Sequence, residues 1–161
     1  MKLNNICLLM LLLFCFVINS CNNHSEINIV PLMLDGLENE LIRMMYADDI
    51  RDVYEITYAK HIEIWYYEID LNDNGYKDII AIVRSPLHSG SRGDSFNIWT
   101  NNGNDKYNYI LGLTARIIAD DPEYSGSIYI SNENTNGFKN VHIISENDIK
   151  LVYQDGKYVI E

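Results

Sequence analysis

The side chains best suited to chemistry lie between residues 70 and 78, where oxygen donors recur at alternate positions. Asp70, Asn72, Asn74 and Asp78 occupy the first, third, fifth and ninth positions, and Gly75 occupies the sixth. Glycine adopts the positive φ of a sharp turn, so the turn brings these oxygens toward one centre. Such oxygens are the ligands that Ca²⁺ prefers. The spacing predicts a Ca²⁺-binding loop, and the alternative is a metal-free turn whose Asx side chains accept backbone amides.

The loop resembles the nine-residue cation loops between β-strands in integrin-type β-propeller repeats. The resemblance implies that Asp70, Asn72, Asn74 and Asp78 coordinate through their side chains, and Tyr76 through its backbone carbonyl. An EF-hand does not fit, because the twelfth position holds alanine instead of a bidentate glutamate. Only two of these side chains carry charge, so we expect a dissociation constant of about 10⁻⁴–10⁻³ M, as in extracellular modules.

A second polar stretch, residues 85–94, leaves an apolar run and combines a histidine, three serines and an arginine. A hydrolase would use Ser89 or Ser91 as the nucleophile and His88 as the base. The serine and glycine spacing is one residue short of the Gly-x-Ser-x-Gly elbow, and adjacent residues of one loop seldom point at each other. We therefore predict that the protein is not an enzyme. His88, Ser89, Ser91 and Arg92 are predicted to contact a partner, and the alternative is a plain connection between strands.

The charge of the chain limits the classes of partner. Lysine and arginine number 12 against 23 aspartates and glutamates, a formal net charge of −11. Such a surface repels phosphate backbones, so nucleic-acid binding is not expected, and a cation or a basic protein is favoured. The Asp48-Asp49 pair is interpreted as solvated charge.

The first residues have the pattern of a lipoprotein signal peptide. Lys2 precedes an apolar run from Ile6 to Ile18, which is short for a membrane span of about 20 residues. The residues before Cys21 resemble the bacterial lipobox, which implies cleavage there and a diacylglyceryl group on the cysteine sulfur. The alternatives are an ordinary secretory signal and a short anchor helix. Cleavage would remove Cys7 and Cys15, so thiol catalysis and thiolate metal sites are not expected.

This pattern divides the chain into a signal peptide (1–20), a lipidated tether (21–30) and one domain (31–161). The lipid is predicted to anchor the domain to a membrane of the bacterial cell envelope, most simply the outer membrane facing the periplasm.

Hydrophobic periodicity predicts an α+β fold. Apolar residues have helical spacing over 32–46 and again over 48–58, and they alternate with polar residues from Ile62 onward. Asn-Gly and Asp-Gly pairs at 136–137 and 155–156 are typical hairpin turns. We therefore predict one or two N-terminal helices packed on an antiparallel β-meander of about six or seven strands.

The chain from Ile64 onward resembles a group of small, mostly uncharacterised bacterial envelope lipoproteins that share short motifs. The matching stretches are Asp70–Asp78, Ser89–Asp94, Asn136–Asn140 and Asp155–Val159. In this chain Asn74 replaces the usual acid, and Ser89 and Asp94 stand where that group has two loop cysteines.

In its size, predicted β content, acidic charge and Ser-Gly-containing loop, the domain also loosely resembles periplasmic lysozyme inhibitors and immunity lipoproteins. The resemblance implies a non-enzymatic binding or inhibitor protein whose partner is a basic envelope enzyme such as a muramidase or amidase, ordered by one Ca²⁺. The alternative is a structural, calcium-stabilised envelope module with no hydrolase target.

Overall fold

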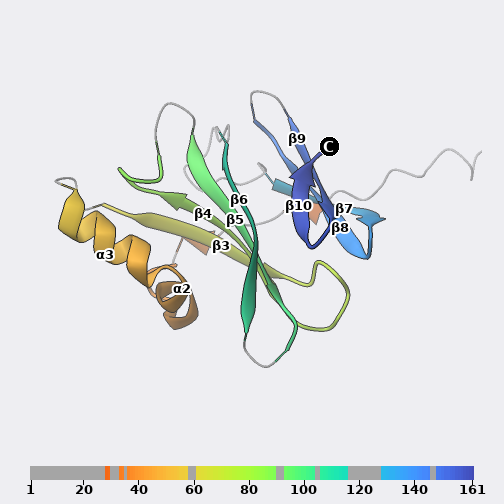
Figure 1. The fold of residues 1–161 in the computed structure, drawn as a ribbon, viewed down its shortest axis with the longest axis horizontal. Coiled ribbons are helices and arrows are strands. Elements are labelled where there is room, and N and C mark those ends of the chain that lie inside the picture. Colours follow the sequence, from red (N-terminus) through yellow and green to blue (C-terminus); the bar gives the residue numbers. More distant parts are fainter. Residues whose placement is uncertain are drawn as a thin grey trace, which may run out of the picture.

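The protein is mainly β, with two antiparallel sheets and two short helices (Figure 1). The computed structural model describes residues 28–29, 33–34, 36–57, 61–89, 93–103, 106–115, 128–145 and 148–161.

Each sheet has five strands within the described residues, and all neighbouring strands are antiparallel. The first has the order β2-β3-β4-β5-β6. Its strands are β2 (Met33–Leu34), β3 (Glu63–Ile69), β4 (Asp78–Arg84), β5 (Asp94–Asn101) and β6 (Tyr107–Ala115). The second has the order β1-β7-β8-β9-β10. Its strands are β1 (Asn28–Ile29), β7 (Ile128–Thr135), β8 (Phe138–Ile143), β9 (Ile149–Gln154) and β10 (Lys157–Ile160).

The first sheet lies between the helices and the second sheet. Helices α2 (Glu40–Met45) and α3 (Ala47–Ile56) cover one of its faces, and β7–β10 lie on the other side (Figure 1). Alternate residues of β4 therefore enter two different cores: Ile80 and Ile82 face the second sheet, and Ile79 and Val83 face the helices. Cover on both faces explains why this strand is apolar at every position from 79 to 83.

The α+β prediction, with N-terminal helices on a single meander, is wrong. Strands make up 55% of the described residues, and they form two sheets. The alternation of apolar residues located the strands, but the alternation of a strand is the same whichever sheet the strand belongs to, so it does not indicate how the strands are divided between sheets. The two helices are a short layer on a two-sheet β structure, with 6 and 10 residues.

The first helix begins later than the sequence spacing predicts. It starts at Glu40, where Oδ1 of Asn39 accepts the backbone N–H of Ile42 at 3.2 Å and caps the first turn. Met33 and Leu34, before this helix, belong instead to the sheet as β2, which pairs with β3, and the N–H of Gly36 donates to the carbonyl of Ile64.

The described part of the chain contains no helix with the length and apolar composition needed to cross a bilayer.

The hairpin turns predicted from Asn-Gly and Asp-Gly pairs are confirmed. Asn136 and Gly137 join β7 to β8 with φ values of 52° and 86°, and Asp155 and Gly156 join β9 to β10 with φ values of 50° and 85°. Two consecutive positive φ values define the type I′ turn, whose twist matches that of the flanking strands.

Candidate functional site

The loop from Asp70 to Asp78 joins β3 to β4 and is held by its own side chains. Asp70 accepts the backbone N–H groups of Asn74 and Gly75, at 3.1 and 2.7 Å. Oδ1 of Asn72 accepts from Asn74 at 3.3 Å, and Oδ1 of Asn74 accepts from Tyr76 at 2.8 Å. Partial burial acts to raise the pKa of Asp70, but these amide donors prevail and lower it below its ordinary value. The predicted ligand oxygens thus serve as backbone acceptors in this turn.

Asp78 ties this loop to a neighbouring strand. Its side chain is fully buried, and its two oxygens accept the N–H groups of Leu71 and Asn101, each at 2.8 Å. Burial raises the pKa of the Asp78 carboxyl, because a charged group is disfavoured away from water. Both carboxylate oxygens are therefore used in fixing the end of β5 against the start of the loop.

The second sheet supplies a cation to the same loop. Nζ of Lys139, on β8, donates to the Asp73 carboxylate at 2.7 Å and to the Asp70 carbonyl at 3.0 Å. The backbone N–H of Lys139 donates to the carbonyl of Leu71 at 2.8 Å. The loop is thus a contact point between the two sheets, with a lysine ammonium balancing its negative charge.

Within the described residues, no group of three or more acidic, histidine or cysteine side chains is arranged to hold a metal ion. Ca²⁺ binding by the loop stays a prediction. It is tested by calorimetric titration of the wild type and of Asp70→Ala with Ca²⁺: saturable heat in the wild type alone would support it, and no heat in either would contradict it.

The second predicted stretch is described only in part, since Ser91 and Arg92, like Cys21, lie outside the described residues. Ser89 is described, and its hydroxyl donates to Asp94 at 2.6 Å while it accepts the N–H of Ser85 at 3.1 Å. The contacts of Ser89 therefore shape the loop between β4 and β5.

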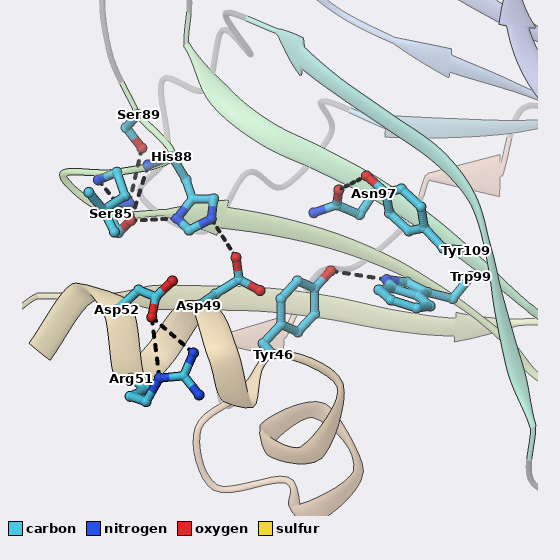
Figure 2. Close-up of polar contacts among 11 residues, drawn as sticks. Tyr46, Asp49, Arg51, Asp52, Ser85, His88, Ser89, Asn97, Trp99 and Tyr109 are labelled. Atoms are coloured by element: carbon cyan, nitrogen blue, oxygen red, sulfur yellow. Dashed lines mark hydrogen bonds and ion pairs between the residues drawn. The ribbon is translucent and has the colours of Figure 1, made fainter. Parts of the chain in front are cut away.

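His88 connects this loop to helix α3. Nε2 of His88 lies 2.7 Å from Oδ1 of Asp49, and Nδ1 lies 2.7 Å from Oγ of Ser85 (Figure 2). The Ser85 hydroxyl also accepts the N–H groups of Leu87 and His88, both at 3.2 Å, which uses both of its lone pairs. Its single proton is left for Nδ1, so we assign the His88 tautomer that donates its Nε2–H to Asp49.

An Asp–His–Ser chain of this kind has the connectivity of an acyl-transfer triad, but its serine is poorly placed for attack. Ser85 is only 3% exposed, and its oxygen already makes three hydrogen bonds. A nucleophile needs a free lone pair directed at an accessible carbonyl. We infer that His88 and Ser85 act as a support that fixes the orientation of the Asp49 carboxylate.

Asp49 borders a pocket of about 380 Å³ between α3 and the outer face of β5 and β6, which we call the aromatic pocket. Three aromatic side chains and a buried asparagine form its walls together with Asp49 and His88: Tyr46, Trp99, Tyr109 and Asn97.

Direct contacts hold the aromatic side chains together (Figure 2). Nε1 of Trp99 donates to the Tyr46 hydroxyl at 3.2 Å, and the Tyr109 hydroxyl donates to Oδ1 of Asn97 at 3.0 Å. The ring centroids of Trp99 and Tyr109 are 4.8 Å apart with a tilt of 57°. Each polar group on a ring thus has a partner, and Tyr109, which is 54% exposed, is the ring most open to a ligand, whereas Tyr46 is buried.

A β-bulge places Tyr109 in this pocket. Ile98 pairs with Leu111 but Trp99 pairs with Tyr109, so Ile110 is an extra residue on β6. Regular alternation would put Tyr109 on the same face as Leu111, which packs against the core between the sheets. The inserted residue turns Tyr109 to the opposite face, where it meets Trp99.

Gly112 makes room for the Tyr109 ring. A Cβ at this position would lie 1.7 Å from the Tyr109 hydroxyl and 3.4 Å from Oδ1 of Asn97. Gly112 is the cross-strand partner of Asn97, so the tyrosine reaches its hydrogen bond by crossing over the glycine backbone. Any larger residue would displace the ring.

The negative charge of Asp49 affects the pKa values of the tyrosine hydroxyl groups in the pocket. Burial is the main cause that raises the pKa of Tyr46 and of Tyr109, and the nearby Asp49 carboxylate raises both further. No described residue donates a hydrogen bond to Oδ2 of Asp49, whereas Oδ1 is bound to His88. The pocket therefore has one carboxylate oxygen available beside three aromatic rings, an arrangement suited to a cation.

A larger hollow of about 430 Å³ lies on the second sheet, where three isoleucines line it together with Tyr129, His142, Asp148 and Lys150. Most of its exposed lining surface is apolar, whereas the aromatic pocket combines a carboxylate with aromatic rings, so we take the aromatic pocket as the better candidate.

No family model, no curated protein and no solved structure matches this chain. The function proposed below is therefore inferred from the geometry of the site.

Of the predicted partner-binding residues, His88 borders the pocket and Ser89 supports the loop. The aromatic walls of the pocket were not predicted from the sequence. The interpretation of Asp49 as solvated charge is incomplete, because Asp49 binds His88, which lies 39 positions away in the sequence. The sequence did offer one indication: Asp49 lies one helical turn before the buried Val53, which places its carboxylate on the face of α3 that packs against the sheet.

Proposed function

We propose that this chain is a non-enzymatic binding protein of the bacterial cell envelope that holds a basic protein partner. In this proposal a cationic side chain of the partner enters the aromatic pocket. The observation that carries the proposal is the juxtaposition of the available Asp49 carboxylate oxygen with the rings of Tyr46, Trp99 and Tyr109. Aromatic faces and a carboxylate are the two groups that most favour an organic cation.

The overall charge supports the same kind of partner. A formal charge of −11 would accelerate association with a basic protein and oppose association with an acidic one. In the full proposal the domain is anchored through lipidated Cys21, and its partner is a cell-wall hydrolase such as a muramidase or amidase. Binding would inhibit that enzyme by covering its basic surface.

The Asp70–Asp78 loop has a separate, structural role in this proposal. Its contacts with Asn101 and with Lys139 connect the strands and the two sheets on which the rest of the molecule is built. The loop lies outside the set of residues that line the aromatic pocket.

The test uses the full chain, purified in detergent and immobilised, with two basic enzymes, a muramidase and an amidase. Each is offered in native form and after succinylation of its lysines, which reverses the charge of the enzyme without changing its size. We expect saturable binding of at least one native enzyme, weakened by added salt and lost on succinylation. No saturable binding of either native enzyme, or equal binding of native and succinylated forms, would contradict the proposal.

A further inference from the structure

We infer that the group bound in the aromatic pocket is a guanidinium, so that the partner presents an arginine rather than a lysine. The inference rests on the proposed function and makes it more specific. Its first support is the carboxylate of Asp49 on α3, whose Oδ1 is bound to His88 while Oδ2 accepts no hydrogen bond from a described residue. A guanidinium has five N–H donors spread over a plane and can donate to this oxygen while its plane lies on a ring, whereas the three donors of an ammonium diverge from one atom.

The aromatic walls favour the same group. Trp99 and Tyr109 meet at 57°, and Tyr46 stands edge-on to Trp99 with an interplanar angle of 80°. A planar, weakly hydrated guanidinium stacks on such a ring at little cost in hydration. An ammonium holds its water more strongly and gains less from a ring face. The pocket volume of about 380 Å³ also exceeds what a single ammonium group needs.

The chain already binds one of its own guanidinium groups in this way. Arg84 lies over the ring of Trp65, with its guanidinium carbon 5.1 Å from the ring centroid. Its Nε and one terminal nitrogen donate to Oδ2 of Asp94, at 3.2 and 3.1 Å. An aromatic face and a carboxylate thus hold an arginine within the same sheet, on β3, β4 and β5. The aromatic pocket presents the same pair of groups to an external ligand.

The orientation of Asp49 is set by the protein before a ligand arrives. His88 binds Oδ1 at 2.7 Å and is itself held by Ser85 at 2.7 Å. Oδ2 is therefore kept on the side of Tyr46, as Figure 2 shows. A carboxylate fixed in this way loses little side-chain entropy when the ligand binds.

The test uses three blocked tripeptides, acetyl-Gly-X-Gly-amide, in which X is arginine, lysine or citrulline. Citrulline is a neutral analogue with nearly the shape of arginine. Binding to the full chain in detergent is followed by NMR through the indole N–H resonances. The sequence has two tryptophans, and only Trp99 lines the pocket. We expect the arginine peptide to shift the Trp99 resonance and to bind about fivefold more tightly than the lysine peptide, and the citrulline peptide to cause no saturable shift.

A matched pair of variants locates the binding. Asp49→Asn and Asp52→Asn remove the same charge from the same helix, and the two wild-type side chains are similarly exposed, at 39% and 42%. We expect Asp49→Asn to weaken the arginine peptide roughly tenfold and Asp52→Asn to change it by less than about twofold.

Equal affinity for the arginine and lysine peptides, or a citrulline peptide that binds as well as arginine, would overturn the guanidinium assignment. Equal effects of the two variants, or no saturable shift with any peptide, would overturn it as well. None of these results would alter the test with native and succinylated enzymes, so failure of this inference is distinguishable from failure of the proposed function.

Discussion

Replacing Asp78 by asparagine keeps the size of a buried side chain but removes one of its two acceptors. The carboxylate is fully buried and accepts the N–H groups of Leu71 and Asn101 at 2.8 Å each. An asparagine side chain has one carbonyl oxygen, so its NH₂ group must face the other backbone N–H. We therefore expect Asp78→Asn to destabilise the fold, and Asp78→Ala to do so more strongly because it leaves both N–H groups unpaired.

The magnitude follows from the number of unpaired groups. One buried N–H without a partner costs about 1–3 kcal/mol, and removing a buried charge offsets a part of that cost. We expect Asp78→Asn to lower the free energy of unfolding by about 2 kcal/mol at pH 7, which corresponds to a Tm lowered by roughly 5–10 °C. Asp78→Ala should cost about 3–5 kcal/mol.

The pH dependence of this effect has a definite sign. Burial raises the pKa of Asp78 in the folded chain above its value of about 3.9 in the unfolded chain. The folded state then binds the proton more tightly, so the stability that this group contributes is complete below the unfolded pKa and is lost as pH rises through the folded pKa. The stability difference between the wild type and Asp78→Asn should therefore grow as pH falls from 7 to 4.

Asp70 should show the opposite trend, because backbone donors lower its pKa in the folded chain. Its contribution is present above the unfolded pKa and is lost as pH falls through the folded pKa. The stability difference between the wild type and Asp70→Asn should thus shrink on acidification below about pH 4.

Urea unfolding followed by circular dichroism at pH 7, 5, 4 and 3 measures both differences in one set of variants. An unchanged stability of Asp78→Asn at pH 7, or the same pH trend for both variants, would refute the assignment of distinct roles to these two carboxylates.

Two further substitutions test the contacts around the site and between the sheets. Gly112→Ala should displace the Tyr109 ring and break its hydrogen bond to Asn97. We expect the free energy of unfolding, measured in urea, to fall by about 1 kcal/mol, and the affinity for the arginine peptide, measured by NMR titration, to fall at least threefold. Unchanged peptide binding would count against the described pocket. Lys139→Met should lower the free energy of unfolding by about 1 kcal/mol, because it removes the hydrogen bonds from Nζ to the loop, including that to Asp73. An unchanged free energy of unfolding would show that this contact between the sheets contributes nothing measurable.

Local features of the fold were predictable from the sequence because they depend on neighbouring residues alone. The turns at Asn136-Gly137 and Asp155-Gly156 follow from the positive φ that these pairs accept. The helix predicted over 48–58 is present as α3 (Ala47–Ile56). The assignment of strands to two sheets was not predictable in this way, because it depends on contacts such as that between Leu71 and Lys139, which are far apart in the sequence.

The site was predicted less well than the turns and helix α3, because its residues come together only through long-range packing. His88 could be singled out by its type and its loop, but Asp49 and Trp99 come to the same place only through the packing of α3 on the first sheet. Tyr109 faces the pocket because of one inserted residue at Ile110, and a bulge of this kind leaves no mark in the hydrophobic pattern of β6.

In the proposed function, a basic partner binds through the Asp49 carboxylate of the aromatic pocket. This mode of binding is tested most directly by the affinity of the full chain for the native basic enzyme that it binds, measured for Asp49→Asn and for Asp52→Asn at the same ionic strength. The two variants have the same net charge, so we expect Asp49→Asn to weaken the affinity roughly tenfold and Asp52→Asn to weaken it by less than about twofold. Equal affinities of the two variants would contradict it.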